Sequence, residues 1–253
     1  MNNQTILITG GTGKLGKKFV EHFFNKGWNV LFTSTTIKNK KKLEKYFKNN
    51  KKVKGYIFNF LKKNSYKNLI KKINSDKFSI NHLINAARSR KYLKINSKLE
   101  MVTRNDFSSE FILDVVVPYE LSMEIFNTKK NKLKTITNIG SQYGLVTATP
   151  SLYRNYHKDY PIQYGVAKAA LVHLTKELAV KFSENNIRVN CLALGGVEGR
   201  VSASFVKRYS KLSPMGKMLS EEDILTPLDF IMHENSRAIN GQTIIADGGW
   251  TLW

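Results

Sequence analysis

The chain has 253 residues, 42% of them hydrophobic, and its 41 Lys and Arg against 19 Asp and Glu give a formal net charge of +22. This length fits one α/β domain, and the absence of any run of about 18 apolar residues excludes a membrane-spanning helix. Residues 1–4 lack the basic start and apolar stretch of a signal peptide, and the single cysteine, Cys191, excludes an intrachain disulfide. We therefore expect a soluble protein of the reducing cytoplasm.

The positive charge raises the question of a nucleic-acid partner. Most of the excess comes from lysines mixed with asparagines, as in KNKKKLEKYFKNNKKVKG at 38–55. These lysines alternate with apolar helix positions, and no nucleic-acid-binding motif accompanies them, which favours solvated helix faces. We predict a small-molecule substrate, with neither a nucleic acid nor a membrane as partner.

Apolar runs of strand length alternate with helical patterns along the chain. Strands are predicted at 5–9, 28–33, 53–59, 81–87, 133–140, 187–194 and 242–247, and the main helices at 14–25, 40–47, 66–73, 106–126 and 163–182. Repeated strand and helix units indicate parallel strands joined by right-handed crossovers. The sequence thus predicts a single α/β domain over 1–253, a doubly wound parallel sheet of seven strands with helices on both faces. Ligands of such sheets bind beyond the carboxyl ends of the strands.

Three glycines, Gly10, Gly13 and Gly16, separate the first strand from the first helix. Glycines at such a turn permit close approach of a pyrophosphate and close packing of helix on sheet, although an ordinary turn would explain two of the three. Their position in the first strand and helix unit favours a dinucleotide site.

The end of the second predicted strand bears on the choice of cofactor. It carries Ser34, Thr35 and Thr36, followed by Lys38, and lacks the acidic residue that holds the ribose of NAD. Hydroxyls and a lysine would tolerate a 2′-phosphate, which favours NADP(H), with NAD possible. The same residues could also form a plain polar loop.

Tyr164 and Lys168 lie four residues apart at the start of a predicted helix, in YGVAKAALVHLTKELAV. Both side chains therefore point from one face, where an ammonium lowers the pKa of a neighbouring phenol and lets it exchange a proton with a substrate oxygen. Taken alone, such a pair is usually plain helix surface. Ser141, at the end of the fifth predicted strand, could hydrogen-bond the same substrate oxygen.

With these residues in place, the chain resembles the short-chain dehydrogenases/reductases over essentially its whole length. The motifs that carry the resemblance are TGGTGKLG, NAA at Asn85–Ala87, IGS ending at Ser141, YGVAK, IRVNCLALGG at Ile187–Gly196 and GQTIIADGGW at Gly241–Trp250. The resemblance implies a Rossmann-type fold, hydride transfer between nicotinamide and a carbonyl or alcohol carbon, and a homodimer or homotetramer.

The resemblance also implies residue roles. Tyr164 would be the acid/base, Lys168 would support it and hold the nicotinamide ribose, and Ser141 would orient the substrate. The implied cofactor-binding residues are Gly10, Thr12, Gly13, Lys14, Leu15, Gly16, Ser34, Thr35, Asn59, Phe60, Asn85, Ala86, Ala87, Tyr164, Lys168, Gly195 and Val197.

Four positions depart from the family pattern. Lys14 stands where the turn has a glycine, and it could meet a cofactor phosphate, which we favour, or point to solvent. Asp114 stands where an asparagine holds a water in the proton relay, and as the fourth candidate catalytic residue it could hold that water or pair with Lys168. Ala87 replaces a glycine and Leu194 a proline, and both changes could shift the cofactor.

The segment 142–163, between Ser141 and Tyr164, is longer than in most of the family and should border the substrate pocket. It carries four tyrosines beside basic residues, which suit a sugar bearing phosphate or nucleotide; local packing of the tyrosines is the alternative. The predicted substrate-binding residues are Gln142, Tyr143, Tyr153, Arg154 and Gly196. The segment 199–218 corresponds to the family's substrate lid, and its Arg200, Lys207 and Arg208 favour an anion.

These features lead to one main hypothesis, an NADP(H)-preferring oxidoreductase acting on a keto or hydroxy group of a polar, anionic sugar derivative. The long insertion and the ending DGGWTLW resemble a bacterial subgroup linked to surface-sugar and flagellin-glycan pathways. A reductase of carrier-linked 3-oxoacyl groups and a non-catalytic nucleotide-binding homologue remain alternatives. The histidines lack ligand spacing, so no catalytic metal is predicted.

Overall fold

A parallel sheet of seven strands organises the computed structural model, which describes residues 4–96 and 100–253. The strands are β1 (Thr5–Ile8), β2 (Asn29–Ser34), β3 (Val53–Ile57), β4 (His82–Asn85), β5 (Thr135–Ser141), β6 (Arg188–Leu194) and β7 (Thr243–Ala246). Their order is β3-β2-β1-β4-β5-β6-β7, which confirms the predicted sheet. The chain steps outward in one direction from β1 and in the other from β4, so a ligand crevice is expected where these two strands end.

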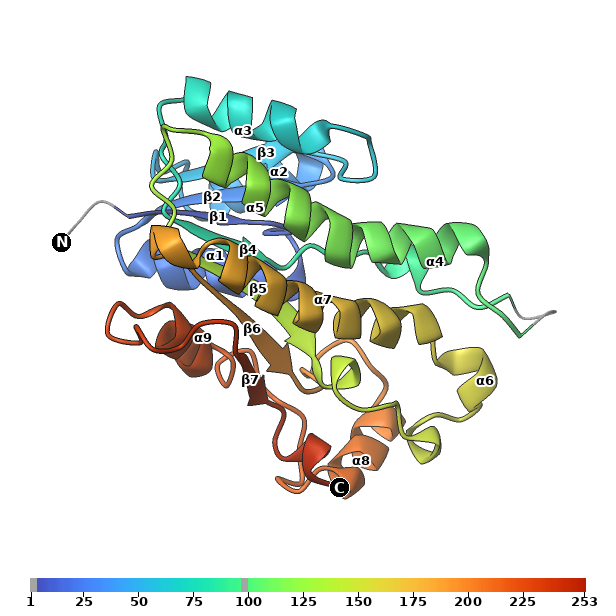
Figure 1. Cartoon of the computed structure of the whole chain (residues 1–253). Coiled ribbons are helices and arrows are strands. Elements are labelled where there is room, and N and C mark those ends of the chain that lie inside the picture. The colour runs from blue at the N-terminus through green and yellow to red at the C-terminus, as the bar shows by residue number, and fades with distance from the viewer. Residues whose placement is uncertain (1–3, 97–99) are drawn as a thin grey trace.

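Helices cover both faces of the sheet (Figure 1). On one face, α1 (Lys14–Asn25), α2 (Ile37–Tyr46) and α9 (Leu225–Met232) pack in one apolar core. On the other, α3 (Ser65–Ser75), α5 (Val117–Asn127) and α7 (Ile162–Lys181) pack in a second core. The remaining helices are α4 (Arg104–Phe111), α6 (Tyr156–Asp159) and α8 (Ala203–Leu212).

The apolar strand β1 shows why the sequence builds two cores. Ile6 and Ile8 belong to the core under α1, while Leu7 belongs to the core under α7, because successive strand side chains point to opposite faces. All three are fully buried. A parallel strand covered on both sides is therefore largely apolar, and here only the first residue, Thr5, is polar.

The helix predicted over 106–126 differs from the one observed. It begins at Arg104 and is interrupted by a π-helical turn, Ile112–Val116, before α5 continues. Pro118 gives the physical reason, because proline lacks an N–H and its ring clashes with the carbonyl four residues earlier, that of Asp114. Asp114 consequently lies in a widened turn.

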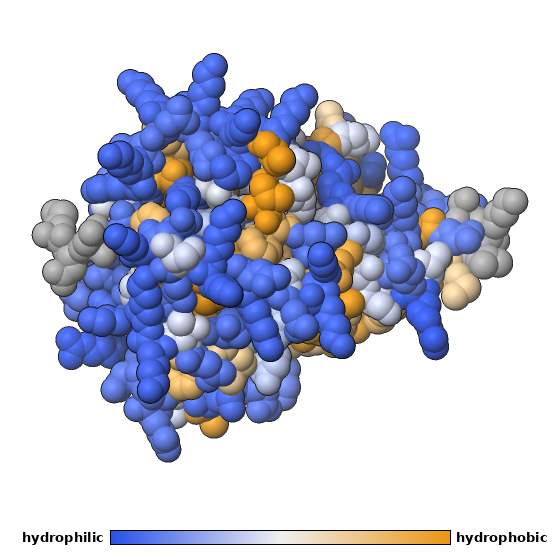
Figure 2. Space-filling model, turned by 90° about the horizontal axis from the view of Figure 1, so that it is seen from above, coloured by the Kyte–Doolittle hydropathy of each residue, from blue (hydrophilic) through white to orange (hydrophobic). Residues whose placement is uncertain are grey.

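A third, smaller cluster lies beyond the carboxyl ends of β5 and β6, where α6 and α8 sit at the lower right of Figure 1. Its buried members are Leu152, Tyr209, Met218 and Trp250. Seen from above, the surface is mostly hydrophilic, with narrow apolar patches (Figure 2). Within the described ranges, no helix combines the length and apolar character needed to cross a membrane.

Candidate active site

The glycine turn is held together by backbone contacts. Gly10 has a φ of +69°, and a Cβ on it would lie 2.7 Å from the Cα of Ala87. A Cβ on Gly16 would lie 2.2 Å from the carbonyl oxygen of Gly10, so neither glycine has room for a side chain. Gly13 precedes α1 without a side-chain cap, and the first turn of α1 has no acidic residue. The turn thus leaves helix N–H groups for an anion, which fits a pyrophosphate.

Lys14 does not point to solvent. Its Nζ lies 3.7 Å from Oε1 of Glu221, and a Cβ built on Gly199 would be 3.0 Å from that Nζ. The side chain is 17% exposed. It therefore crosses from the glycine turn to the loop that follows β6, on the side where an anion would bind at α1.

The hydroxyls after β2 mostly have partners within the protein. Thr12 donates to Ser34 (3.2 Å), Ser34 donates to the carbonyl of Thr36 (3.1 Å), and Thr36 caps α2. Ser34 is buried, whereas Thr35 and Lys38 are exposed beyond the strand end. The polar-loop alternative is therefore part of the structure, and Thr35, Thr36 and Lys38 are the members that face solvent.

Two further residues of the cofactor list lie after β3. Asn59 is exposed, and its side chain accepts a hydrogen bond from the Leu61 N–H. Phe60 is buried in the core under α3 and α5, with its ring near that of Phe58. Phe60 therefore presents its backbone rather than its ring to any ligand at the sheet edge.

Asn85 ties the end of β4 to its neighbours through a buried chain of hydrogen bonds. Its Nδ2 donates to Oδ1 of Asn138 (2.8 Å), whose Nδ2 donates to Oγ1 of Thr175 on α7 (2.9 Å). The hydroxyl of Thr9 accepts from the N–H groups of Ala86 and Ala87. Oδ1 of Asn85 is buried and has no hydrogen-bond partner in the described part of the chain. This orphaned acceptor fits a site that a polar cofactor completes.

Lys168 is buried between α7, β5 and the π turn. Its Nζ lies 3.0 Å from Oδ1 of Asp114 and donates to the carbonyl of Ile139 at 2.9 Å. Burial lowers the pKa of Lys168, but Asp114 and then Tyr164 raise it, and the net change is upward. Of the two alternatives for Asp114, the structure contains the ion pair with Lys168.

Tyr164 and Ser141 complete the candidate catalytic set. Nζ of Lys168 lies 5.8 Å from the centroid of the Tyr164 ring, so the pair shares one helix face. Ser141 is the last residue of β5, two residues after Ile139, and its hydroxyl accepts from the N–H of Tyr143. The four predicted catalytic residues therefore come from three adjoining elements at one edge of the sheet.

Glu110 was missed by the sequence reasoning. It is fully buried one helical turn before Asp114, and both of its carboxyl oxygens lack a partner among the described residues. Burial, and then the charge of Asp114, raise its pKa to about 7, against the opposing effects of Arg88 and Lys168. The spacing of four between Glu110 and Asp114 was the signal that could have found it.

Arg88 was missed as well. Its guanidinium carbon lies 4.1 Å from the centroid of the Tyr164 ring, closer than Lys168 does. The residue directly follows the NAA motif, at the edge of the sheet where ligands are expected. A basic residue at that place was the available signal.

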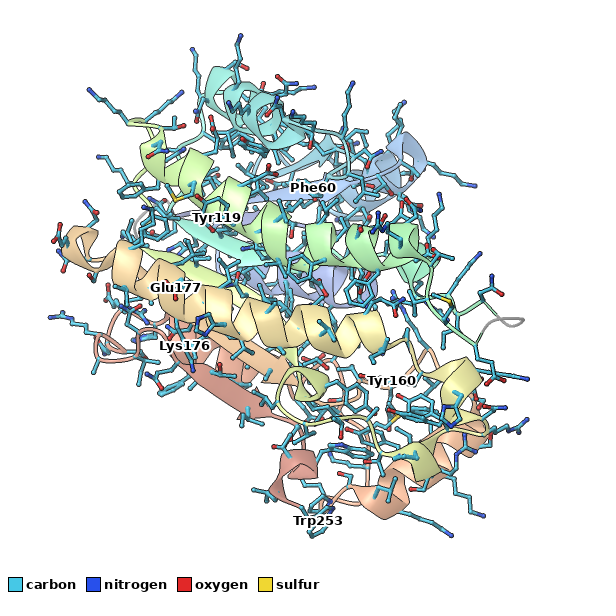
Figure 3. All side chains as sticks on the ribbon, turned by 45° about the vertical axis from the view of Figure 1, so that its right-hand side comes forward. Phe60, Tyr119, Tyr160, Lys176, Glu177 and Trp253 are labelled. Carbon is cyan, nitrogen blue, oxygen red and sulfur yellow. The ribbon has the colours of Figure 1, made fainter. Side chains whose placement is uncertain are left out.

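The tyrosines of the insertion pack on one another. The ring of Tyr160, at the junction of α6 and α7 (Figure 3), lies 5.7 Å from Tyr143, 5.6 Å from Tyr153 and 5.4 Å from Tyr156, between centroids. Arg154 is exposed and donates to Ser204 at 3.5 Å. Of the two alternatives for the tyrosines of the insertion, the structure shows local packing of the rings on one another.

The lid segment is bonded to the insertion. The hydroxyl of Tyr209 accepts from the N–H of Gly196 (2.8 Å) and donates to Oε1 of Gln142 (2.9 Å), and Arg208 donates to the carbonyl of Leu152 (2.7 Å). The Gln142 amide oxygen and Arg208, expected at the substrate, thus join the insertion to α8. Both side chains bind residues of the third cluster, Gln142 to Tyr209 and Arg208 to Leu152.

Metal-ligating side chains do not assemble in the part of the chain that the structure describes. There, no three His, Cys, Asp or Glu residues are placed to hold an ion.

Comparisons with known proteins found a matching family model and several similar proteins. A family model described as "Enoyl-(Acyl carrier protein) reductase" matches residues 13–251. The chain is 27% identical over 254 residues to the 3-oxoacyl-(acyl-carrier-protein) reductase FabG of Buchnera aphidicola subsp. Schizaphis graminum, covering 98% of each chain. It is 35% identical over 124 residues to post-translational flagellin modification protein A of Campylobacter coli, covering 49% of this chain and 48% of that protein.

A solved structure with the same architecture is a 4-hydroxyisoleucine dehydrogenase complexed with NADH and succinate. It is 25% identical, with a TM-score of 0.83, and the match covers 98% of this chain and 100% of that one.

Proposed function

The chain belongs to the short-chain dehydrogenase/reductase family of NAD(P)-dependent oxidoreductases, and from this premise we propose that it transfers hydride between NADP(H) and a keto or hydroxy group of a polar, anionic sugar derivative. The observation that carries the proposal is the buried Lys168, fixed between Asp114 and the β5 backbone beside the Tyr164 ring. Such a fixed cation next to a phenol is what a proton-transfer site requires.

The residues at the sheet edge fit a nicotinamide cofactor, which supplies or accepts the hydride when bound. The glycine turn and the α1 N–H groups would hold its phosphates, with Lys14 alongside, and Asn85 would meet its central part with the orphaned amide oxygen. The absence of a carboxylate at the end of β2, with Thr35 and Lys38 exposed there, favours NADP(H) over NAD(H).

The chain's own residues would handle the proton. In the reductive direction Tyr164 donates its hydroxyl proton to the substrate oxygen, and Lys168 stabilises the resulting phenolate by its charge. Ser141 orients the substrate oxygen. Asp114 fixes the ammonium of Lys168 at 3.0 Å, and the widened π turn places its carboxylate there.

Three findings support a polar, anionic substrate. The net charge is strongly positive, the chain is similar over half its length to a post-translational flagellin modification protein, and the similar dehydrogenase structure contains the dianion succinate. The full-length similarity to FabG favours, as a second candidate, the reduction of carrier-linked 3-oxoacyl groups.

Replacement of Tyr164 by Phe tests the proposal. We expect turnover to fall by about 10³-fold, the scale of one lost general acid, while NADPH still binds in a fluorescence titration. Turnover is assayed on phosphorylated and nucleotide-linked keto sugars, with an acetoacetyl thioester as the arm for the second candidate. Turnover retained by the Tyr164→Phe protein would contradict the proposed role.

We propose a homodimer or homotetramer as the working form, in the cytoplasm. Val166 and Val180 on α7 are 43% and 75% exposed, and an oligomer interface there would cover them. Light scattering of the purified protein measures the oligomeric state directly.

A further inference from the structure

The position of Arg88 is fixed from two sides. Behind it, the hydroxyl of Thr9 holds the N–H groups of Ala86 and Ala87 at 2.9 and 3.0 Å. Ahead of it, the loop is tied to α7, because Nε2 of the buried Gln163 donates to the carbonyl of Tyr92 at 2.7 Å. Gln163 immediately precedes Tyr164, so the same contact aligns the loop with the candidate catalytic ring.

The charge of Arg88 is not matched by an ion pair. Lys168, the other cation near Tyr164, has Asp114 as a salt-bridge partner, whereas Arg88 has no carboxylate within salt-bridge distance in the ranges 4–96 and 100–253. The charge of Arg88 acts on Glu110, but burial raises the pKa of this carboxyl to about 7, so it keeps its proton below about that pH. An exposed, uncompensated guanidinium therefore stands over the ring that would transfer the proton.

Three cations of the insertion and of α8 are in a different situation. Arg208 donates to a backbone carbonyl, Arg154 lies near Ser204, and Lys158 lies 3.4 Å from a carboxyl oxygen of Glu100. Each has a partner within the protein. Arg88 is thus the cation near Tyr164 whose N–H donors are best placed to serve a ligand.

We propose that Arg88 binds a carboxylate or phosphate group of the substrate, and that this group lies within a few bonds of the reacting carbon. The inference rests on the proposed function and deepens it by assigning the residue that recognises the anion. A guanidinium presents a planar fork of donors that pairs with a carboxylate or phosphate through two hydrogen bonds. Contact with the face of an aromatic ring holds the guanidinium in place without using those donors.

The distance restricts the class of substrate. With 4.1 Å between the Arg88 guanidinium carbon and the Tyr164 ring centroid, an anion held by Arg88 lies beside the Tyr164 ring, and the proposal places it close to the substrate oxygen that this residue would protonate. A keto acid, a sugar acid or a sugar phosphate whose charged group neighbours the keto group satisfies this condition. A nucleotide-linked sugar with its charge many bonds away does not.

The first experiment measures anion binding with the purified full chain. Succinate and inorganic phosphate are titrated calorimetrically into the wild-type protein, with and without saturating NADPH. We expect Arg88→Gln to weaken binding of at least one probe by tenfold or more and Arg88→Lys to weaken it less. Comparison of the two probes separates a carboxylate from a phosphate as the preferred group.

Arg90→Gln is the matched control, because Arg90 is an exposed arginine two residues further along the same loop and its loss changes net charge equally. It should bind both probes like the wild type. If Arg88→Gln also binds both probes like the wild type, the inference is wrong. The inference is also wrong if Arg88→Gln loses affinity for NADPH but binds succinate and phosphate as the wild type does, since Arg88 would then contact the cofactor.

Kinetics give the second test. On an anionic substrate found in the sugar panel, Arg88→Gln should raise KM at least tenfold and change kcat much less, because the lost contact binds a charged group that does not itself react, and so it stabilises the bound substrate and the transition state equally. Failure of wild-type protein to bind NADPH would overturn the proposed function, whereas the probe titrations without NADPH would still decide the role of Arg88.

Discussion

The two sides of the candidate site are built by different means. On the cofactor side, the turn between β1 and α1 is defined by close backbone contacts, with a Cβ on Gly16 falling 2.2 Å from a carbonyl oxygen. On the substrate side, aromatic and amide side chains from the insertion and α8 hold one another, with Tyr209 at their centre. Close backbone contacts require glycines, which can be recognised in the sequence. Side-chain packing between distant segments produces no such pattern.

Adding a side chain within the glycine turn should have the largest effect on the cofactor side. Gly16→Ala places a methyl group against the Gly10 carbonyl and 2.7 Å from the Cα of Gly11, so α1 must shift. We expect it to lower the free energy of unfolding by about 3 kcal/mol and to abolish measurable NADPH binding. Denaturant unfolding and NADPH fluorescence measure the two effects.

Gly13→Ala is the matched control. Gly13 has a φ of −72°, and a Cβ there meets only the Gly10 carbonyl oxygen, at 3.1 Å. We expect a stability change of about 1 kcal/mol or less, with weaker NADPH binding because the methyl group occupies the approach of the phosphates. Equal destabilisation by both substitutions would contradict a backbone contact specific to Gly16.

Glu110 is buried on α4, one helical turn before Asp114, and there the stability of the fold depends on charge rather than on close contacts. Its pKa in the folded chain is about 7 against an ordinary value of 4.5, so the folded chain keeps a proton that the unfolded chain releases between those pH values. Stability should therefore fall as the pH rises through this window and stay low above it. The expected change is about 3 kcal/mol.

Glu110→Gln removes this dependence, because an amide stays neutral. Urea unfolding measures the unfolding free energy of both proteins at pH 5 and pH 8. The wild type should lose stability over this range, so the difference between variant and wild type should change by about 3 kcal/mol in favour of the variant. Asp114, Lys168 and Arg88 are the charged groups that act on Glu110. Glu177→Gln, at an exposed site on α7 (Figure 3), is the control, and parallel behaviour of the two variants would count against the effect of burial.

On the substrate side we expect a smaller effect than those of Gly16→Ala and Glu110→Gln. Tyr209→Phe leaves the Gly196 N–H and the buried Gln142 amide without their shared hydroxyl, at a cost of about 1–2 kcal/mol. KM for the substrate should rise because Gly196 is less firmly held, while NADPH affinity stays the same. Tyr46→Phe, which removes an exposed hydroxyl bonded to Glu21, is the control for loss of a phenol. Weaker NADPH binding by Tyr209→Phe alone would show that the two sides are not separate.

Much of the fold could be predicted, because strands and helices have local periods and the glycine turn and the Tyr164 and Lys168 spacing lie within single segments. The π turn could have been foreseen from Pro118, since proline disturbs the carbonyl four residues before it. The direction of Lys14 could not, because it depends on Gly199 and Glu221, far along the chain.

The same reason explains the two missed residues. Glu110 and Arg88 acquire their significance only when α4 and the loop after β4 pack beside α7, and the sequence shows neither distance. The tyrosines of the insertion left two interpretations open, because whether they face a ligand or one another depends on where α8 lies. Each of these cases joins segments more than 40 residues apart in the numbering.

The central place of β1 has a consequence for biosynthesis. The strand pairs with β2 on one edge and with β4 on the other, so its second edge has no partner until residues 82–85 have been made. A nascent chain that stops short of β4 would expose the unpaired backbone groups of a largely apolar strand, which are a template for pairing with other chains. The arrival of β4 covers this edge of β1, and the open edge then moves to β4 until residues 135–138 have been made.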